Sequence, residues 1–178
     1  MRVLGVDPGT RMSGMLLYDT DTEEVLHSEE VDNKDLLDAL RSAKLCGVFD
    51  TGDIELAIED IEGMGLMVGK DVFETCIWIG RFIEAWEYNH GGSEAHRISR
   101  GDEKIVICGC KTVINPQTGK RKAVSDSMIR KAVIEKFPAS GGGKTPQVGT
   151  KKLPGPLYGV KGHCWSALAI VITYLETR

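Results

Sequence analysis

The sequence has no long hydrophobic run and no leader pattern. None of its apolar stretches reaches the ~18–20 residues that a membrane-spanning helix needs. Met1 leads almost directly into an apolar segment, without the basic, apolar and small-residue regions of a signal peptide. We therefore expect a cytoplasmic protein that makes no contact with a membrane.

Cysteine is sparse and irregularly spaced. The chain has 5 cysteines, an odd number, and several lie in apolar segments typical of a protein core. In a cytoplasmic chain the default is a reduced, buried thiol. Cys108-Gly109-Cys110 is the only close pair in the sequence, and it lacks the second pair that a structural zinc site needs. We therefore expect reduced thiols and no zinc finger.

Basic residues are scarce in the first half of the chain. Residues 1–96 contain 7 Lys or Arg against 21 Asp or Glu, whereas residues 97–162 contain 14 against 4. The formal net charge of −4 thus hides a basic segment of the kind that follows a phosphate backbone. Solvated loop lysines are the alternative, and the clustering favours nucleic-acid binding.

What the sequence does contain is a regular succession of apolar segments. Their pattern predicts strands over residues 1–6, 14–18, 24–30, 54–58 and 95–98. Helical spacing predicts helices over residues 34–45, 71–88, 125–137 and 165–175. Asn33 is the expected N-cap of the first helix, and Ser125 or Asp126 that of the third. Residues 139–156, rich in Gly, Lys and Pro, are predicted to form a loop.

This order of elements predicts an α/β fold. The first three strands suggest an antiparallel meander, and the later strands alternate with helices, which favours parallel pairing. We expect one domain over residues 1–178, with a mixed central sheet flanked by helices. The expected apolar face of the longest helix consists of Val72, Phe73, Cys76, Ile79, Ile83 and Trp86. The tryptophans Trp78, Trp86 and Trp165 are expected in the core rather than stacked on bases.

Acidic residues stand where two apolar strands end. Asp7 ends the first predicted strand, and Glu59 and Asp60 follow the strand over residues 54–58. If these strands are neighbours, the carboxylates converge and repel each other unless a cation lies between them. Oxygen ligands suit Mg²⁺ or Mn²⁺. For Asp7 alone, in Asp-Pro-Gly, a turn-forming role is the alternative.

The ordered motifs resemble those of a known family, the RuvC type of Holliday-junction resolvase in the RNase H-like superfamily. The segment from Gly5 to Thr10 (GVDPGT) resembles its opening motif, and Ala57-Ile58-Glu59 resembles its second acidic motif. Val68-Gly69-Lys70 with Gly80-Arg81 is similar to the glycine-marked helix that contributes to dimer contacts in that family. The segment from Gly162 to Ala169 (GHCWSALA) resembles the last metal-binding motif, most of all that of phage-encoded RuvC-like proteins.

The resemblance implies a metal-dependent DNA endonuclease with Asp7, Glu59 and His163 as catalytic metal ligands and Asp60 as a weaker one. It implies two-metal hydrolysis of phosphodiester bonds with two Mg²⁺ or Mn²⁺ ions. One position departs from the family, whose last motif usually carries acidic residues or a His followed three positions later by an Asp. Here Ser166 follows His163, so the last carboxylate is missing. A His163 that only caps the last helix is the alternative.

The resemblance also implies partners. The expected substrate is a four-way junction or other branched DNA, cut by a homodimer in a bacterial cytoplasm that holds a phage or prophage. The expected DNA-binding residues are Lys120, Arg121, Lys122, Arg97, Arg100 and Lys104. Two alternatives stay open: a nuclease of the same fold acting on other DNA structures or RNA–DNA hybrids, and a junction-binding module with impaired catalysis.

Overall fold

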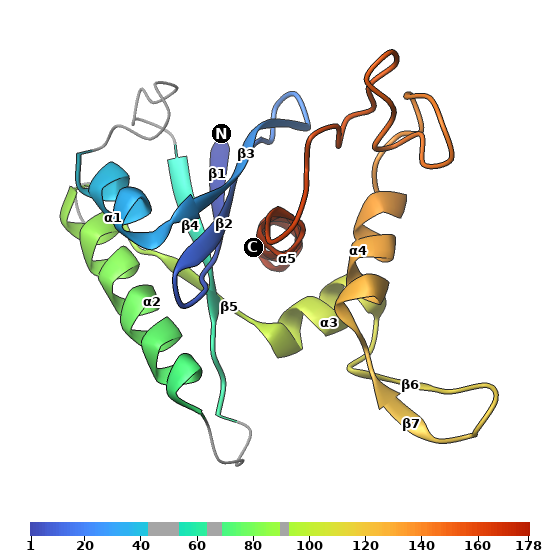
Figure 1. Ribbon diagram of the computed structural model, residues 1–178, viewed down its shortest axis with the longest axis horizontal. Coiled ribbons are helices and arrows are strands. Elements are labelled where there is room, and N and C mark those ends of the chain that lie inside the picture. The colour runs from blue at the N-terminus through green and yellow to red at the C-terminus, as the bar shows by residue number, and fades with distance from the viewer. Residues whose placement is uncertain (43–53, 64–68, 90–92) are drawn as a thin grey trace.

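The computed structural model describes residues 1–42, 54–63, 69–89 and 93–178 (Figure 1). A five-stranded sheet forms its centre, in the order β3-β2-β1-β4-β5. The strands are β1 (Arg2–Asp7), β2 (Met12–Asp19), β3 (Glu24–Asp32), β4 (Ile54–Asp60) and β5 (His96–Ser99). The predicted end of the first helix, Cys46 and Val68 of the glycine-marked motif lie outside the described residues.

The sheet is mixed, as the element order predicts. β1 pairs with β2 and β2 with β3 in antiparallel fashion, which makes the meander. β4 lies parallel to both β1 and β5. Strand β1 is therefore central, and its buried pattern of Val3, Leu4 and Val6 reflects packing on both faces of the sheet.

Helices cover both faces (Figure 1). Helices α1 (Asn33–Ser42) and α2 (Lys70–Asn89) pack on one face, where Leu36, Leu56 and Phe82 belong to one buried cluster. Helix α5 (Cys164–Thr177) lies on the other face, and it is apolar almost all round because α3 and α4 cover its outer side.

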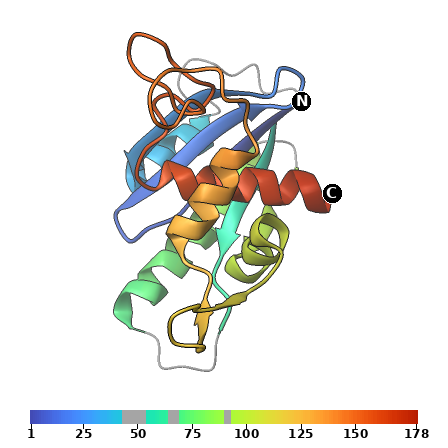
Figure 2. The same cartoon turned by 90° about the vertical axis from the view of Figure 1, so that its right-hand side faces the viewer.

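The outer layer consists of α3 (Arg100–Cys108) and α4 (Asp126–Glu135), which are connected by a two-stranded hairpin. The hairpin strands are β6 (Thr112–Ile114) and β7 (Arg121–Ala123), and Figures 1 and 2 show them projecting from the body. A turn that begins at Asn115 closes the hairpin: the Asn115 N–H donates to the carbonyl of Lys120, and Gly119 takes a φ of 66°.

Two local expectations were wrong, and helix α3, which ends with the apolar residues 105–108, was not predicted. Asn33 does not cap α1: its side chain accepts from Ser13 and donates to the Gly9 carbonyl, while Asp32 accepts from the Lys34 N–H. The apolar face predicted for α2 is buried only in its C-terminal half, with Ile79 and Trp86.

The N-terminal half of α2 instead lies at the surface. Phe73 and Ile77 are each 60% exposed, and Cys76 is exposed as well, although a buried thiol was expected there. Cys164, in contrast, is buried in the core as predicted. Of the tryptophans, Trp86 and Trp165 are buried and Trp78 is half-buried. In the described part of the chain, no helix is both long and apolar enough to span a membrane.

Candidate active site

The ends of two neighbouring parallel strands bring the first two carboxylates together. Val6 of β1 lies opposite Ile58 of β4, so Asp7 and Glu59 follow side by side at the same edge of the sheet. Asp7 is 7% exposed and the Glu59 side chain 19% exposed. The predicted convergence of these two residues is therefore present in the structure.

Two glycines allow the last helix to approach this edge. A Cβ atom on Gly5 would lie 2.4 Å from the carbonyl oxygen of Ala167, and one on Gly14 would lie 2.5 Å from the backbone of His163. Only glycine tolerates such contact, so these two positions set how closely α5 packs on β1 and β2. The approach places His163 and Ser166 beside Asp7.

His163 points at the carboxylates. Its Nδ1 lies 3.0 Å from Oδ2 of Asp7, and its backbone N–H donates to Oε1 of Glu30 at 3.0 Å. His163 occupies the N-cap position of α5, but its side chain makes no capping hydrogen bond. The ring is therefore engaged with Asp7 rather than with the helix end, which argues against the capping alternative.

Burial dominates the acid–base properties of the pair. It raises the pKa of Asp7, opposed by hydrogen bonding to Glu59 and by the charge of Arg100. Burial also raises the pKa of Glu59 to about 8, and the hydrogen bond and charge of Asp7 raise it further. Two carboxyl groups that share a hydrogen bond hold a proton between them, and the proton occupies a place suited to a cation.

Two further acids belong to the cluster, and sequence reasoning missed both. Glu103 of α3 is fully buried, and Arg100 contacts Glu103 and Asp126 and lies 3.9 Å from Glu59. One carboxyl oxygen of Glu103, Oε1, has no hydrogen-bond partner. Burial raises the pKa of Glu103 to about 8, opposed by Arg100.

The sequence contains a signal that places Arg100 and Glu103 at the site. Ser99-Arg100-Gly101-Asp102 is a capping pattern, and in the structure the Ser99 hydroxyl oxygen accepts from the Asp102 N–H and caps α3. Once a helix begins at Arg100, the spacing of three puts Arg100 and Glu103 on the same side of it. That side faces Glu59.

The side chains of the site are ligand types that suit a divalent cation, but their arrangement is not that of a complete metal site. Adjacent carboxylates of Asp7 and Glu59 with the imidazole of His163 are ligand types that Mg²⁺ and Mn²⁺ accept. Within the described ranges, however, no three His, Cys, Asp or Glu side chains are gathered as a metal site would require. Asp60, the weaker predicted ligand, pairs instead with Arg97 at 2.8 Å.

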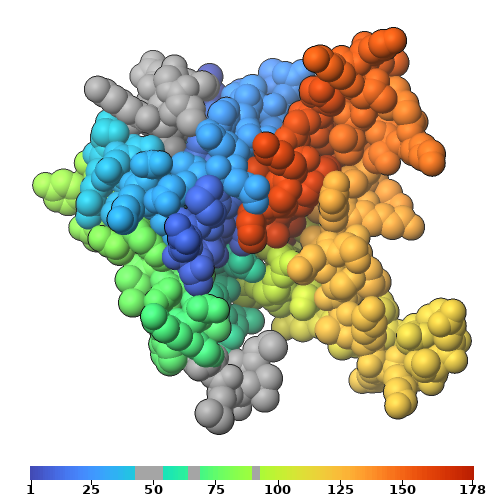
Figure 3. All heavy atoms as spheres, viewed as in Figure 1, coloured from blue at the N-terminus to red at the C-terminus, as the bar shows by residue number. Residues whose placement is uncertain are grey.

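The predicted DNA-binding residues separate into two groups. Lys120, Arg121 and Lys122 lie exposed on the projecting hairpin, at the lower right of Figure 3. Arg97 and Arg100 lie near the carboxylates, since Arg97 pairs with Asp60 and Arg100 enters the acidic cluster. Lys104 is half-buried on α3.

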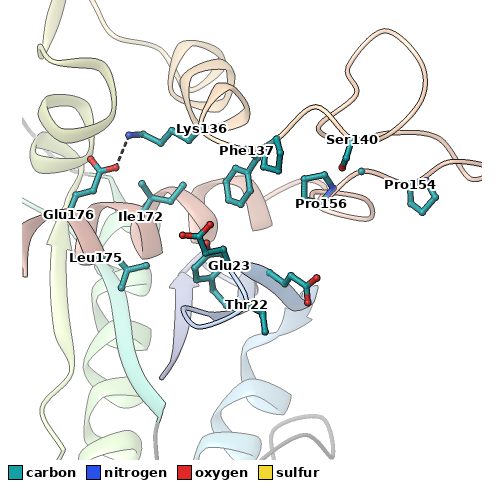
Figure 4. Close-up of a pocket in the computed structure, with 14 residues that line it drawn as sticks. Thr22, Glu23, Lys136, Phe137, Ser140, Pro154, Pro156, Ile172, Leu175 and Glu176 are labelled. Carbon is teal, nitrogen blue, oxygen red and sulfur yellow. Dashed lines mark hydrogen bonds and ion pairs between the residues drawn. The ribbon is translucent and has the colours of Figure 1, made fainter.

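Two cavities lie on the α4–α5 side of the protein. One, of about 470 Å³, adjoins the cluster and is lined by Arg100, Asp126, Arg130, His163 and Ser166 among others. The second, of about 570 Å³, is shown in Figure 4. It lies between Phe137, Ile172 and Pro156 and contains none of the candidate catalytic residues, so it is not part of the site.

Comparison with known proteins agrees with this arrangement at the level of the fold. No family model matches the chain, and a search of curated proteins finds no relative. Two solved structures are similar over 99% of this chain. "T. thermophilus RuvC in complex with Holliday junction substrate" has a TM-score of 0.60 at 15% identity, with 93% of that chain covered. "Thermus thermophilus RuvC structure" has a TM-score of 0.59 at 16% identity, with 94% covered.

Both of these structural neighbours are thus RuvC proteins, the family that the sequence motifs resemble. The five-stranded mixed sheet flanked by helices is the RNase H-like fold of those proteins.

Proposed function

We propose that this protein is a metal-dependent endonuclease that cleaves phosphodiester bonds in branched DNA, with four-way junctions as its main substrate. One observation carries the proposal: Glu59 and His163 each lie against Asp7, at the edge of a sheet whose fold is similar to that of RuvC structures. One of these neighbours is bound to a Holliday junction.

In the proposed site, Asp7 and Glu59 would hold the metal, with His163 as the third ligand and Asp60 as a weaker one. When bound, two Mg²⁺ or Mn²⁺ ions activate a water molecule and stabilise the charge on the attacking and leaving oxygens. To hold a cation, the paired carboxyls would have to give up their shared proton, and the cation would then supply the neutralising charge. The neutral imidazole of His163 contributes a lone pair and no charge.

Ser166 and Arg100 shape the charge of this site. Burial raises the pKa of Asp7 and a hydrogen bond from Ser166 partly opposes this shift, but a hydroxyl cannot supply the negative charge of a carboxylate. Arg100 already neutralises part of the cluster through Glu59, Glu103 and Asp126. The second metal ion is therefore expected to bind less tightly than the first.

The protein is proposed to act as a homodimer, because two active sites related by a two-fold axis suit a four-way junction, which is cut in two strands. The exposed apolar face of α2, with Phe73, Cys76 and Ile77, supports α2 as the contact. The hairpin cluster Lys120, Arg121 and Lys122 would hold the DNA backbone. The expected setting is the cytoplasm of a bacterium carrying a phage genome.

A second candidate is a junction-binding module that does not cut. The observation that favours it is Ser166, because the site then lacks one carboxylate. A nuclease of the same fold that acts on nicked or flapped DNA or on RNA–DNA hybrids would use the same carboxylates, and the residues do not separate it from the first proposal.

A substrate panel tests the proposal. Purified protein is incubated with labelled four-way junction, flap, nicked duplex, linear duplex and RNA–DNA hybrid of matched length, in Mg²⁺ and in Mn²⁺. We expect symmetric nicks in opposite strands of the junction and slower or no cleavage elsewhere. Faster cleavage of a hybrid or flap would assign the site to that substrate instead.

A further inference from the structure

The cavity beside the carboxylates contains a second arginine that the sequence gives no reason to select. Arg130 of α4 lines it together with Arg100, His163 and Ser166. The Arg130 guanidinium carbon lies 4.4 Å from the centre of the Trp165 ring, a stacking distance. Trp165 belongs to buried helix α5 and is 5% exposed, so the surface on which Arg130 rests is rigid.

The surroundings of Arg130 differ from those of its neighbours. Arg97 and Arg100 pair with carboxylates of the site. Among the residues that the structure describes, no carboxylate lies within ion-pair distance of Arg130. Stacking on an indole uses the flat face of a guanidinium and leaves its N–H groups in the plane free to donate. Arg130 is thus oriented and charged, with its donors available.

The acidic side chains in the same cavity are already engaged. Glu30 accepts the backbone N–H of His163, and Asp126 pairs with Arg100. An anion entering the cavity therefore meets one guanidinium with free donors, that of Arg130, because Arg100 and Asp126 pair with each other. A planar guanidinium recognises a phosphate through two parallel hydrogen bonds.

We propose that Arg130, positioned by Trp165, binds a backbone phosphate of the DNA strand next to the phosphate that is cleaved. This inference rests on the proposed function and adds a substrate contact at the mouth of the active site, separate from the hairpin. Arg130 is a binding residue with a fixed orientation, so both its charge and its planar shape contribute to affinity.

The test measures DNA binding without cleavage. Junction affinity is measured by fluorescence anisotropy in EDTA at several salt concentrations, for wild type, Arg130→Gln, Arg130→Lys and Lys131→Gln. Lys131 is the matched control: it is the next residue of α4, carries the same charge, is 78% exposed and pairs with Glu135 at 3.8 Å. Thermal unfolding of each variant checks that the fold is kept.

We expect Arg130→Gln to raise the Kd about tenfold, which is the effect of losing one charge-assisted hydrogen-bonded contact. The salt slope, which is the slope of the logarithm of affinity against the logarithm of salt concentration, should become about 0.9 less steep. Arg130→Lys should keep most of the salt slope but lose affinity, because lysine does not provide the planar pair of donors. Lys131→Gln should change the Kd less than twofold.

If wild type binds the junction and Arg130→Gln binds it with the same Kd, this inference is overturned and the proposed function still stands. Equal losses in the Arg130 and Lys131 variants would also overturn it, since general charge would then explain both. Absence of DNA binding by wild type would overturn the proposed function itself.

Discussion

Replacing Glu103 with glutamine removes a buried acid from the carboxylate cluster while preserving its shape. Glu103 is fully buried, and its pKa lies at about 8 against an ordinary value of 4.5. In the unfolded chain the group ionises near pH 4.5, whereas in the folded protein it keeps its proton to about pH 8. The folded state therefore binds more protons in this interval, and stability must fall as the pH rises through it.

The size of this effect follows from the displaced pKa. A displacement from 4.5 to about 8 corresponds to a loss on the order of 5 kcal/mol for one group between pH 4.5 and pH 8. Glu59, with a pKa also raised to about 8, contributes a loss of similar size. Without Glu103, the pH-dependent loss should become smaller, and the losses from Glu59 and Asp7 should remain.

The assay is urea unfolding followed by circular dichroism at pH 5, 7 and 9, in EDTA so that no divalent ion binds the carboxylates. We expect wild type and Glu103→Gln to be similar at pH 5, where the acid is protonated in the folded state. At pH 9 the variant should be more stable than wild type by several kcal/mol. Glu84→Gln, a change of an exposed acid on α2, is the matched control and should follow wild type.

The opposite result would refute this reasoning. If Glu103→Gln is destabilised most at pH 9, Glu103 is a charged partner of Arg100 whose ion pair outweighs its burial. An unchanged pH slope would show that Glu103 does not titrate between pH 5 and pH 9.

Three further predictions concern DNA, metal and assembly. Replacing Lys120, Arg121 and Lys122 with glutamine should weaken junction binding and reduce the salt slope by up to about 2.7; an unchanged slope in anisotropy titrations would place the hairpin off the DNA path. Ser166→Asp should tighten Mn²⁺ binding at least tenfold by calorimetry, because it adds a carboxylate beside Asp7; equal affinity would argue that position 166 does not face the metal. Ile77→Glu should shift the protein to monomer in light scattering with its fold retained, and a persistent dimer would exclude this face of α2.

Much of the fold was predictable because its signals are local. The apolar runs of β1, β2 and β4 and the polar turn before Glu24 determine strands and a meander without knowledge of the rest of the chain. The position of Asp7 opposite Glu59 follows from two strands ending at one edge. Such features depend on residues that are close in sequence or on a common rule of sheet topology.

The missed parts depend on contacts between distant segments. Glu103 joins the site only because α3 follows β5 and turns toward Glu59 across the sheet edge. The exposure of Phe73 and Ile77 depends on where α2 extends beyond the sheet, which helical periodicity alone does not indicate. Periodicity identifies an apolar face, but not whether a partner within the same chain covers it.

The effect of the missing carboxylate at the last motif also depends on contacts between distant segments. Ser166 is visible in the sequence as a missing carboxylate, yet only the structure shows Arg100 lying against the remaining acids. The charge of the site therefore depends on an arginine from a helix that the sequence pattern did not reveal.

The most direct test of a metal-dependent junction endonuclease compares wild type with Asp7→Asn on one labelled four-way junction. Binding is measured in EDTA and strand cleavage in Mn²⁺, on the same preparations. We expect both proteins to bind the junction and only wild type to introduce paired nicks, with cleavage by the variant reduced at least a hundredfold. Equal binding with no cleavage by either protein would contradict the proposed function and identify a binding module. Equal cleavage by both would show that Asp7 is not at the reacting centre.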